Sequence, residues 1–290
     1  MLSEITKSQA KKHNNSFEIN GDVVQLRDPF TGENLSSERP PQSLEFMAGL
    51  AGGFEYLKSR DNLTVRLYGE SHADEHQVNK DELLAQLAMS DAVFLELVDH
   101  TPATEKAFWD VSMNGGAEIT AGLMYDMGPH TFDQLNALVD ANKPVFLPEP
   151  SREGTQYDQE INEYMHIIDK LLPVALSGGD EGIVLAAEIA VSASTMMRDW
   201  YMIGKMGQQI ELFEEKTGIK ITNPMIWIGS VHTDTLQPKL EALGITTSVA
   251  IESTHGYVSS GEAGERSLPK NGSISMVDAA RNGLARISRR

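Results

Sequence analysis

The chain of 290 residues contains no cysteine. This absence excludes thiolate nucleophiles, disulfide bonds, cysteine-ligated zinc and iron–sulfur clusters. It leaves the redox compartment open, because a cysteine-free chain suits either environment. An amino-terminal cysteine that could carry a lipid is missing as well, so we expect no lipid anchor of that kind.

Positive charge and long apolar runs are also scarce. Lys and Arg number 24 against 42 Asp and Glu, a net charge of −18 that repels phosphate backbones, so we expect no nucleic-acid partner. The most apolar stretch, IVLAAEIAVSASTMM at 183–197, contains Glu188 and is too short to span a bilayer. The polar start MLSEITKSQAKKHNNS lacks the apolar core of a secretory signal, and we therefore expect a cytoplasmic protein with no membrane span.

The sequence does contain an alternation of strand-like and helix-like segments. Helical spacing separates most of the apolar, strand-like runs, which lie at 63–68, 92–97, 144–148, 225–229 and 246–251. This alternation predicts an α/β fold with a mostly parallel central sheet flanked by helices. The chain is long enough to bury a core of that kind.

The two ends of the chain differ from this alternation. We expect a disordered tail at 1–15 and a single α/β domain over 16–275. The run SFEINGDVVQL at 16–26 predicts an N-terminal β-hairpin, because Asn-Gly suits a type I′ turn between two alternating runs. Residues 276–290 carry four arginines against one aspartate, which predicts a basic C-terminal helix.

A large helical insertion is expected inside the domain, at about 103–142 and 158–217, as a cap over one edge of the sheet. Within its second part, Gly204 and Gly207 are expected to break or kink the helix. Gly218 follows as the glycine that ends it.

Two tetrapeptides, GESH and GSVH, come directly after strand-like runs. In an open parallel sheet, ligands bind beyond the carboxyl ends of the strands. Gly69 and Gly229 would let the backbone turn sharply or approach a ligand there. If the two strands are neighbours, His72 and His232 are aimed at one point. The alternative is that each histidine is an ordinary loop residue or takes the place of a helix cap, since so short a pattern arises by chance.

Several charged residues near the expected strand ends are candidate partners of the two histidines. Glu70 belongs to the first tetrapeptide, and Glu96 closes the strand AVFLEL, where a buried carboxylate is costly unless it is paired or functional. Glu149 ends the next strand, although its flanking prolines also suit a plain exposed turn. Arg198 follows the apolar helical run and needs a partner if it faces inward; otherwise it is an exposed helix arginine near Asp199.

In their order and spacing, four segments resemble the superfamily that joins TraB and TIKI proteins, erythromycin-esterase-like enzymes and ChaN-like proteins. The segments are VRLYGESHADEH, DAVFLELVDH, MMRDWYMIGKM and MIWIGSVHTDTLQPKLEALGI, which together cover roughly residues 63–250. The resemblance implies a functional set made of Glu70, His72, Glu96, Arg198 and His232.

The resemblance further implies a hydrolase of ester or peptide bonds that acts on a small molecule or a peptide. Its TIKI branch implies a bound divalent metal, Mn²⁺, Co²⁺ or Zn²⁺. The metal ligands would be His72, His232 and Glu96, with the backbone at Gly69 and Gly229 beside the bound cofactor. Imidazoles and carboxylates are an ordinary ligand set for these ions.

Two mechanisms follow from this set. With a metal, the bound water loses its proton to Glu70 or Glu96, and Arg198 stabilises the developing oxyanion. Without a metal, as the erythromycin-esterase branch implies, His72 is the base and one of the two glutamates orients it.

The ChaN-like branch implies a different class, a haem- or ligand-binding protein without catalysis. Haem would then be held through an axial His or Tyr. A third reading is an interaction protein whose site has decayed, which the presence of both GxxH tetrapeptides disfavours.

Overall fold

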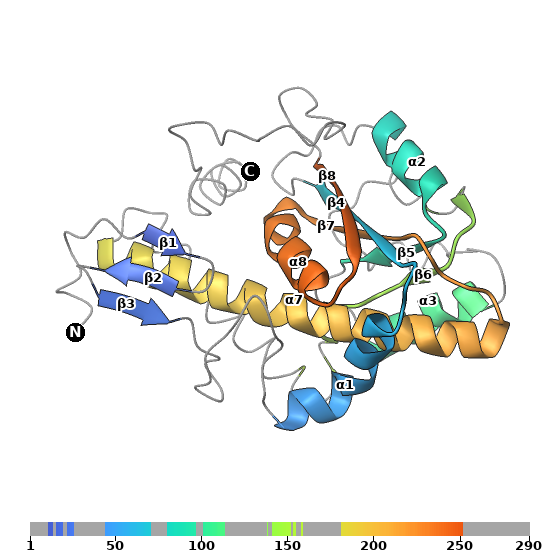
Figure 1. The fold of residues 1–290 in the computed structure, drawn as a ribbon, viewed down its shortest axis with the longest axis horizontal. Coiled ribbons are helices and arrows are strands. Elements are labelled where there is room, and N and C mark those ends of the chain that lie inside the picture. The colour runs from blue at the N-terminus through green and yellow to red at the C-terminus, as the bar shows by residue number, and fades with distance from the viewer. Residues whose placement is uncertain are drawn as a thin grey trace.

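The computed structural model describes eleven parts of the chain: residues 11–13, 16–19, 22–25, 44–70, 80–96, 101–113, 138, 141–151, 153–154, 158 and 181–251. The helices and strands in these parts form one central sheet with helices on both faces and a small separate sheet (Figure 1).

The central sheet has five strands, all parallel, in the order β6-β5-β7-β4-β8. They are β4 Thr64–Glu70, β5 Ala92–Leu95, β6 Val145–Phe146, β7 Pro224–Gly229 and β8 Thr246–Ile251. The predicted α/β fold with a mostly parallel sheet is therefore confirmed, and each strand overlaps one of the apolar runs in the sequence.

The strand order brings the two GxxH tetrapeptides together. β7 inserts between β4 and β5, so the strands that precede GESH and GSVH are neighbours. In the register of this pair, Glu70 lies opposite Gly229, and on the other side of β7 Leu95 lies opposite Trp227. The carboxyl ends of β4, β5 and β7 thus meet at one edge of the sheet, where parallel sheets bind ligands.

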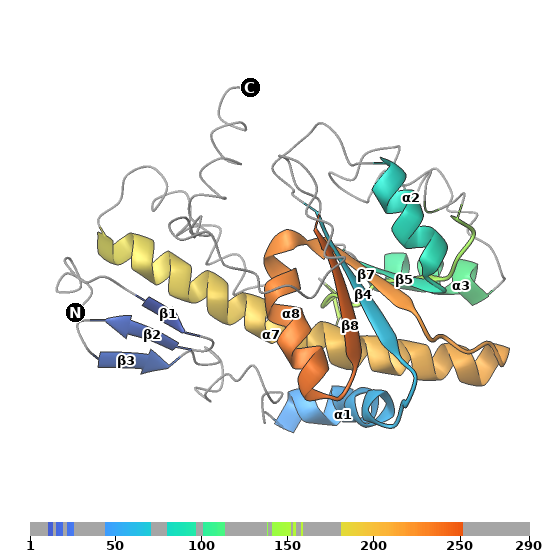
Figure 2. The same cartoon turned by 45° about the horizontal axis from the view of Figure 1, so that its top comes forward.

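The helices cover the sheet unequally. Helices α1 Leu44–Lys58, α7 Glu181–Thr217 and α8 Ser230–Ala242 pack on one face, and α2 Lys80–Met89 packs on the other (Figures 1 and 2). Helix α3 Pro102–Met113 lies at the β6 edge. There the Ser112 hydroxyl donates to the Val145 carbonyl at 2.9 Å and accepts from the Val145 N–H at 2.8 Å, which satisfies part of that edge.

Each face of the sheet has its own apolar core, because successive side chains of a strand point to opposite faces. On β7, Ile226 and Ile228 lie in the core on the α7 side, whereas Met225 and Trp227 lie in the core on the α2 side. None of the four is more than 2% exposed. Such unbroken burial is typical of a central strand in a parallel sheet.

The second half of α7 belongs to the core on its side of the sheet. Trp200, Ile203 and Phe213 are buried there against strands β4, β5 and β7. This stretch is part of the range that was expected to form a cap over one edge of the sheet. It packs instead against one face of the sheet. The N-terminal half of α7 extends past the sheet toward the small β-sheet (Figures 1 and 2).

The expectation that Gly204 and Gly207 break the helix is wrong, because α7 continues through both. Both glycines face Gly53 of α1. A Cβ built on Gly53 would lie 1.9 Å from the Gly204 carbonyl oxygen, and one built on Gly207 would lie 2.2 Å from the Gly53 carbonyl oxygen. These glycines let two helix backbones touch. Gly218, with a φ of 72°, ends α7 as predicted.

The small sheet consists of three antiparallel strands, β1 Lys11–His13, β2 Ser16–Ile19 and β3 Asp22–Gln25. β1 lies inside the range expected to be a tail. Asn20 and Gly21, the predicted hairpin turn, lie outside the described residues, as does the predicted helix at 276–290.

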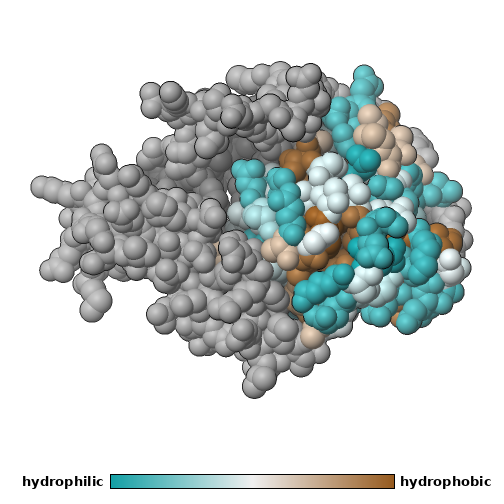
Figure 3. All heavy atoms as spheres, in the orientation of Figure 1, coloured by the Kyte–Doolittle hydropathy of each residue, from teal (hydrophilic) through white to brown (hydrophobic). Residues whose placement is uncertain are grey.

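In the part of the chain that the structure describes, no helix is both long enough and apolar enough to cross a bilayer. On the face shown in Figure 3, hydrophilic side chains cover most of the described surface, with apolar side chains between them.

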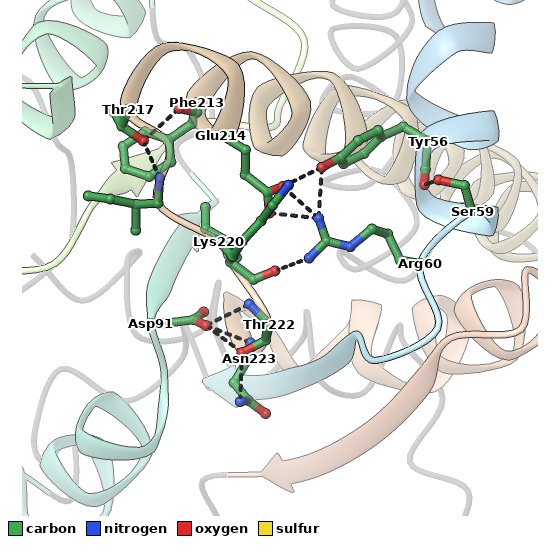
Figure 4. Close-up of polar contacts among 12 residues, drawn as sticks. Tyr56, Ser59, Arg60, Asp91, Phe213, Glu214, Thr217, Lys220, Thr222 and Asn223 are labelled. Carbon is green, nitrogen blue, oxygen red and sulfur yellow. Dashed lines mark hydrogen bonds and ion pairs between the residues drawn. The ribbon is translucent and has the colours of Figure 1, made fainter.

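A polar cluster ties α1, α7 and β7 together at the amino-terminal edge of the sheet (Figure 4). The Glu214 carboxylate accepts hydrogen bonds from Arg60 at 2.7 Å, Tyr56 at 2.6 Å, Lys220 at 2.6 Å and the Ile221 N–H at 2.9 Å. Burial alone would raise the pKa of Glu214, but these donors outweigh it and lower the pKa to about 2.

Candidate functional site

Arg198 of α7 lies between two carboxylates at the carboxyl-terminal edge of the sheet. Its Nη2 donates to Glu96 Oε1 at 2.8 Å and to Glu149 Oε1 at 2.7 Å, and its Nε donates to Glu149 Oε2 at 3.1 Å. All three residues are at most 7% exposed. The guanidinium therefore links the middle of α7 to the segments that follow β5 and β6, and the three side chains have a formal net charge of −1.

His232 of α8 forms a second buried group with Asp199 and Lys239. The His232 Nδ1 lies 2.6 Å from Asp199 Oδ1, and Lys239 Nζ donates to Asp199 Oδ2 at 2.8 Å. Asp199 is fully buried, and the other two are 4% and 1% exposed. Since a carboxylate can only accept, Nδ1 is the donor in this contact, and in the tautomer that it favours the lone pair lies on Nε2.

The two groups meet at Glu96. His232 Nε2 lies 3.7 Å from Glu96 Oε1, the oxygen that Arg198 also binds. The other oxygen, Oε2, accepts the Gly229 N–H at 2.6 Å. Gly229 is the cap residue of α8, so the helix begins at the sheet edge and places His232 in its first turn.

The charged state of the site follows from these contacts. Burial alone would raise the pKa of Asp199, but the Lys239 ammonium and the hydrogen bond with His232 outweigh it, and the pKa is lowered. Burial likewise opposes the charge of Arg198, yet Glu149 and Glu96 raise its pKa above the ordinary value. Arg198 is a cation and Asp199 an anion throughout the physiological range.

The structure brings together three of the residues predicted from the sequence: Glu96, Arg198 and His232. Glu96 and Arg198 were expected to need a partner if buried, and they are each other's partner. Glu149, for which an exposed turn was the alternative, is 2% exposed and paired with Arg198. The exposed alternative for Arg198 is wrong for the same reason.

The first GxxH tetrapeptide is only partly described. Gly69 lies within β4, paired with Ile228 and Ile251, so the strand passes through it without a turn. The backbone of Glu70 lies beside Gly229 in the sheet. His72 lies outside the described residues, and its place beside His232 stays a prediction.

Asp199 and Lys239 are not among the functional residues predicted from the sequence. A signal exists for each. Asp199 is the second of two consecutive charged residues in an apolar helical run, and an inward Arg198 makes the pair conspicuous. Lys239 lies on the same face of the helix as His232 and the buried Leu236. A lysine is unusual on a face that points into the core.

The described residues do not by themselves provide a metal site. Both Glu96 oxygens accept hydrogen bonds from the protein, and a dication on Glu96 would lie beside the Arg198 guanidinium. Within the described ranges, no three His, Asp or Glu side chains are placed to hold an ion. His232 alone fits, because metal-binding histidines commonly donate their other N–H to a carboxylate. The predicted metal therefore depends on His72.

A groove of about 320 Å³ lies elsewhere, between α3 and α7. Trp109 and Leu212 contribute apolar surface to it. Its charged side chains pair within the protein, Lys205 with Glu105 at 2.9 Å and Lys106 with Asp110. It lacks the convergence of ionisable groups found around His232.

No protein-family model, curated protein or solved structure matches the chain. The resemblance of the four sequence segments to the superfamily is therefore supported by their motifs alone.

Proposed function

We propose that the protein is a hydrolase of ester or peptide bonds in which His232 is the general base. The observation that carries this proposal is the buried contact between His232 Nδ1 and Asp199, which leaves Nε2 turned toward Glu96 and Arg198. An imidazole oriented by a carboxylate, with its other nitrogen free, is the recurring base of hydrolytic sites. The motif resemblance supports the same class.

The attacking water would lie between His232 and Glu96. Two polar atoms 3.7 Å apart can share one water molecule, which donates one proton to Nε2 and the other to Glu96 Oε1. The oxygen lone pairs of that water then face outward, toward a substrate carbonyl. His232 takes the proton as the new C–O bond forms, and Asp199 stabilises the resulting imidazolium.

Arg198 would stabilise the oxyanion. Two of its nitrogens bind Glu96 and Glu149, and no described residue accepts a hydrogen bond from the third, Nη1. Its position is fixed by two carboxylates, so no reorganisation is needed when negative charge develops. When the tetrahedral intermediate breaks down, the scissile bond cleaves and His232 returns the proton from Nε2 to the leaving oxygen or nitrogen.

The divalent metal implied by the resemblance is an alternative to His232 as the base, and it would depend on the residues around His72. When bound, such an ion would polarise a carbonyl and lower the pKa of a water. His232 Nε2 would then be one ligand, held in orientation by Asp199, and the water proton would go to Glu70 or Glu96. Elemental analysis of protein purified without a histidine tag and without added metal tests this directly: stoichiometric Mn, Co or Zn supports the ion, and its absence together with turnover contradicts it.

The same protein preparation can be used to test the haem-binding alternative. Hemin binding through His232 would give a stoichiometric Soret shift that His232→Gln abolishes. The charged side chains around His232 favour proton transfer over contact with an apolar macrocycle.

A panel of aryl esters and fluorogenic peptides tests the hydrolase. We expect turnover by the wild-type chain and a loss of about 10³-fold or more in His232→Gln, since the base would be gone. Asp234→Asn is the control, because Asp234 is an exposed residue in the same helix. Turnover that survives His232→Gln unchanged contradicts the assignment.

A further inference from the structure

Lys239 is the most deeply buried lysine in the described part of the chain, and its surroundings are specific. Its side chain is 1% exposed. The ammonium donates to Asp199 Oδ2 at 2.8 Å and to the carbonyl of Thr235, one turn earlier in α8, at 2.7 Å. A buried ammonium is costly, and an apolar residue would fill this inward-facing position at lower cost.

The contact divides the Asp199 carboxylate between two partners. Oδ1 faces His232 Nδ1 at 2.6 Å, and Oδ2 faces Lys239. Because both oxygens are engaged from the same helix, α8, the carboxylate cannot rotate about its terminal bond without losing one contact. The Lys239 side chain therefore fixes the plane of the carboxylate, and with it the direction from which an oxygen reaches His232.

We infer that Lys239 is a positioning residue, which holds Asp199 so that His232 keeps its proton on Nδ1 and its lone pair on Nε2. This inference rests on the proposed function, in which Nε2 is the base. Lys239 acts only through Asp199, and its role differs from that of Arg198, which binds Glu96 and Glu149.

The loss of the ammonium has two consequences for Asp199. The carboxylate gains rotational freedom, and its Oδ2 is left buried without a donor. Asp199 can then turn away from Nδ1, and that change removes the preference for the Nδ1–H form of His232. Substrate binding need not change, because among the described residues Lys239 bonds to Asp199 and Thr235 and not to Glu96 or Arg198.

The test uses the full chain with Lys239→Met, which keeps the length of the side chain, and Lys239→Arg, which keeps the charge. Lys106→Met is the matched control, since that lysine side chain is 73% exposed. Thermal melting first establishes that each variant is folded. Long-range ¹H–¹⁵N correlation spectra at alkaline pH then show which ring nitrogen of His232 carries the proton, the signals being assigned by their loss in His232→Gln.

In the wild type, Lys239→Arg and Lys106→Met, we expect a single form with the proton on Nδ1. In Lys239→Met we expect both tautomers, and kcat lower by about 10- to 100-fold with KM within about twofold. A merely structural lysine would change stability and leave the ring spectrum alone. A folded Lys239→Met with one Nδ1–H form and wild-type kcat overturns the inference.

Three further outcomes also decide the matter. If Lys239→Met does not fold, Lys239→Leu, which also lacks a donor, takes its place with the same expectation. A wild-type His232 that carries its proton on Nε2 overturns the inference without any variant. If the wild-type chain turns over no ester or peptide, the hydrolase proposal fails, while the ring spectra still decide the role of Lys239.

Discussion

His232 Nδ1 lies 2.6 Å from Oδ1 of Asp199, although the two residues are 33 positions apart in the chain and belong to different helices. The fold produces this contact. β7 enters the middle of the sheet, so α8 begins next to the stretch of α7 that underlies the sheet edge. A histidine in the first turn of α8 then faces an aspartate of α7.

Asp199→Asn should reduce turnover strongly under conditions in which the protein is folded. An asparagine can donate its amide N–H to Nδ1 and so favour the wrong tautomer of His232, a change that costs about 10⁴-fold in Ser-His-Asp enzymes. The same substitution leaves Lys239 buried without a carboxylate, so we expect the free energy of unfolding to fall by about 3–5 kcal/mol. Steady-state kinetics and urea unfolding measure the two effects.

Asp234→Asn is the matched control for Asp199→Asn, because it makes the same chemical change on an exposed position of α8. It should leave both turnover and stability within error of the wild type. Equal effects of the two substitutions would contradict the special role of Asp199.

Arg198→Met should lower the free energy of unfolding by about 3–5 kcal/mol, because it leaves Glu96 and Glu149 buried without their cation. Adding Glu149→Gln to this variant should restore part of the loss, since one unpaired charge is removed. The double-mutant cycle over urea unfolding is expected to give a coupling energy of about 1 kcal/mol or more. Strictly additive effects would show that Arg198 and Glu149 do not stabilise each other.

The sheet was predictable from the sequence because its evidence is local. Apolar runs such as 225–229 are short, bounded and separated by helical segments, which is enough to predict parallel strands. The order of the strands is different. The position of β7 between β4 and β5 depends on how the helical connections pack against the sheet. The residues of β7 alone do not indicate which strands lie beside it.

The site divides in the same way. Glu96 and His232 were predictable because a strand end is visible in the sequence and chemistry gathers there. Asp199 and Lys239 were missed because each lies inside a helix, and the face that a helix buries depends on a distant partner. Gly204 was misread for a related reason: in sequence, a glycine that breaks a helix looks the same as one that lets another helix approach.

Glu214→Gln should destabilise the protein at neutral pH but not in acid. The pKa of Glu214 is lowered from 4.5 to about 2 in the folded state, so the native protein releases this proton more readily than the unfolded chain does. The charged carboxylate therefore contributes stability above pH 4.5, about 3 kcal/mol, and this contribution is lost as the pH falls toward 2. Urea unfolding of both chains across this range should show their difference shrinking.

The exposed neighbour Glu215 provides the control for this measurement. Glu215→Gln removes the same charge without the Arg60, Tyr56 and Lys220 contacts, and it should show no comparable dependence on pH. A difference between wild type and Glu214→Gln that stays constant from neutral to acid pH would contradict the role of the cluster.

Gly53→Ala and Gly52→Ala, adjacent changes in α1, should have opposite effects on stability. The Cβ added at Gly53 would lie 1.9 Å from the backbone oxygen of Gly204, so α1 and α7 must separate, at a cost of about 1–3 kcal/mol or more. Nothing lies within 4 Å of a Cβ added at Gly52, and alanine there should raise the free energy of unfolding by about 0.5–1 kcal/mol. Urea unfolding at neutral pH measures both.

The same pair of variants links the helix contact to the proposed site. Gly204 follows Arg198 in the same helix, so a shift of α7 away from α1 also displaces the guanidinium from its carboxylates. Misplacement of about 1 Å can cost about 100-fold in rate, so we expect Gly53→Ala to lower kcat while Gly52→Ala leaves it unchanged. A folded Gly53→Ala with wild-type stability would mean that the backbones of α1 and α7 do not touch at these glycines.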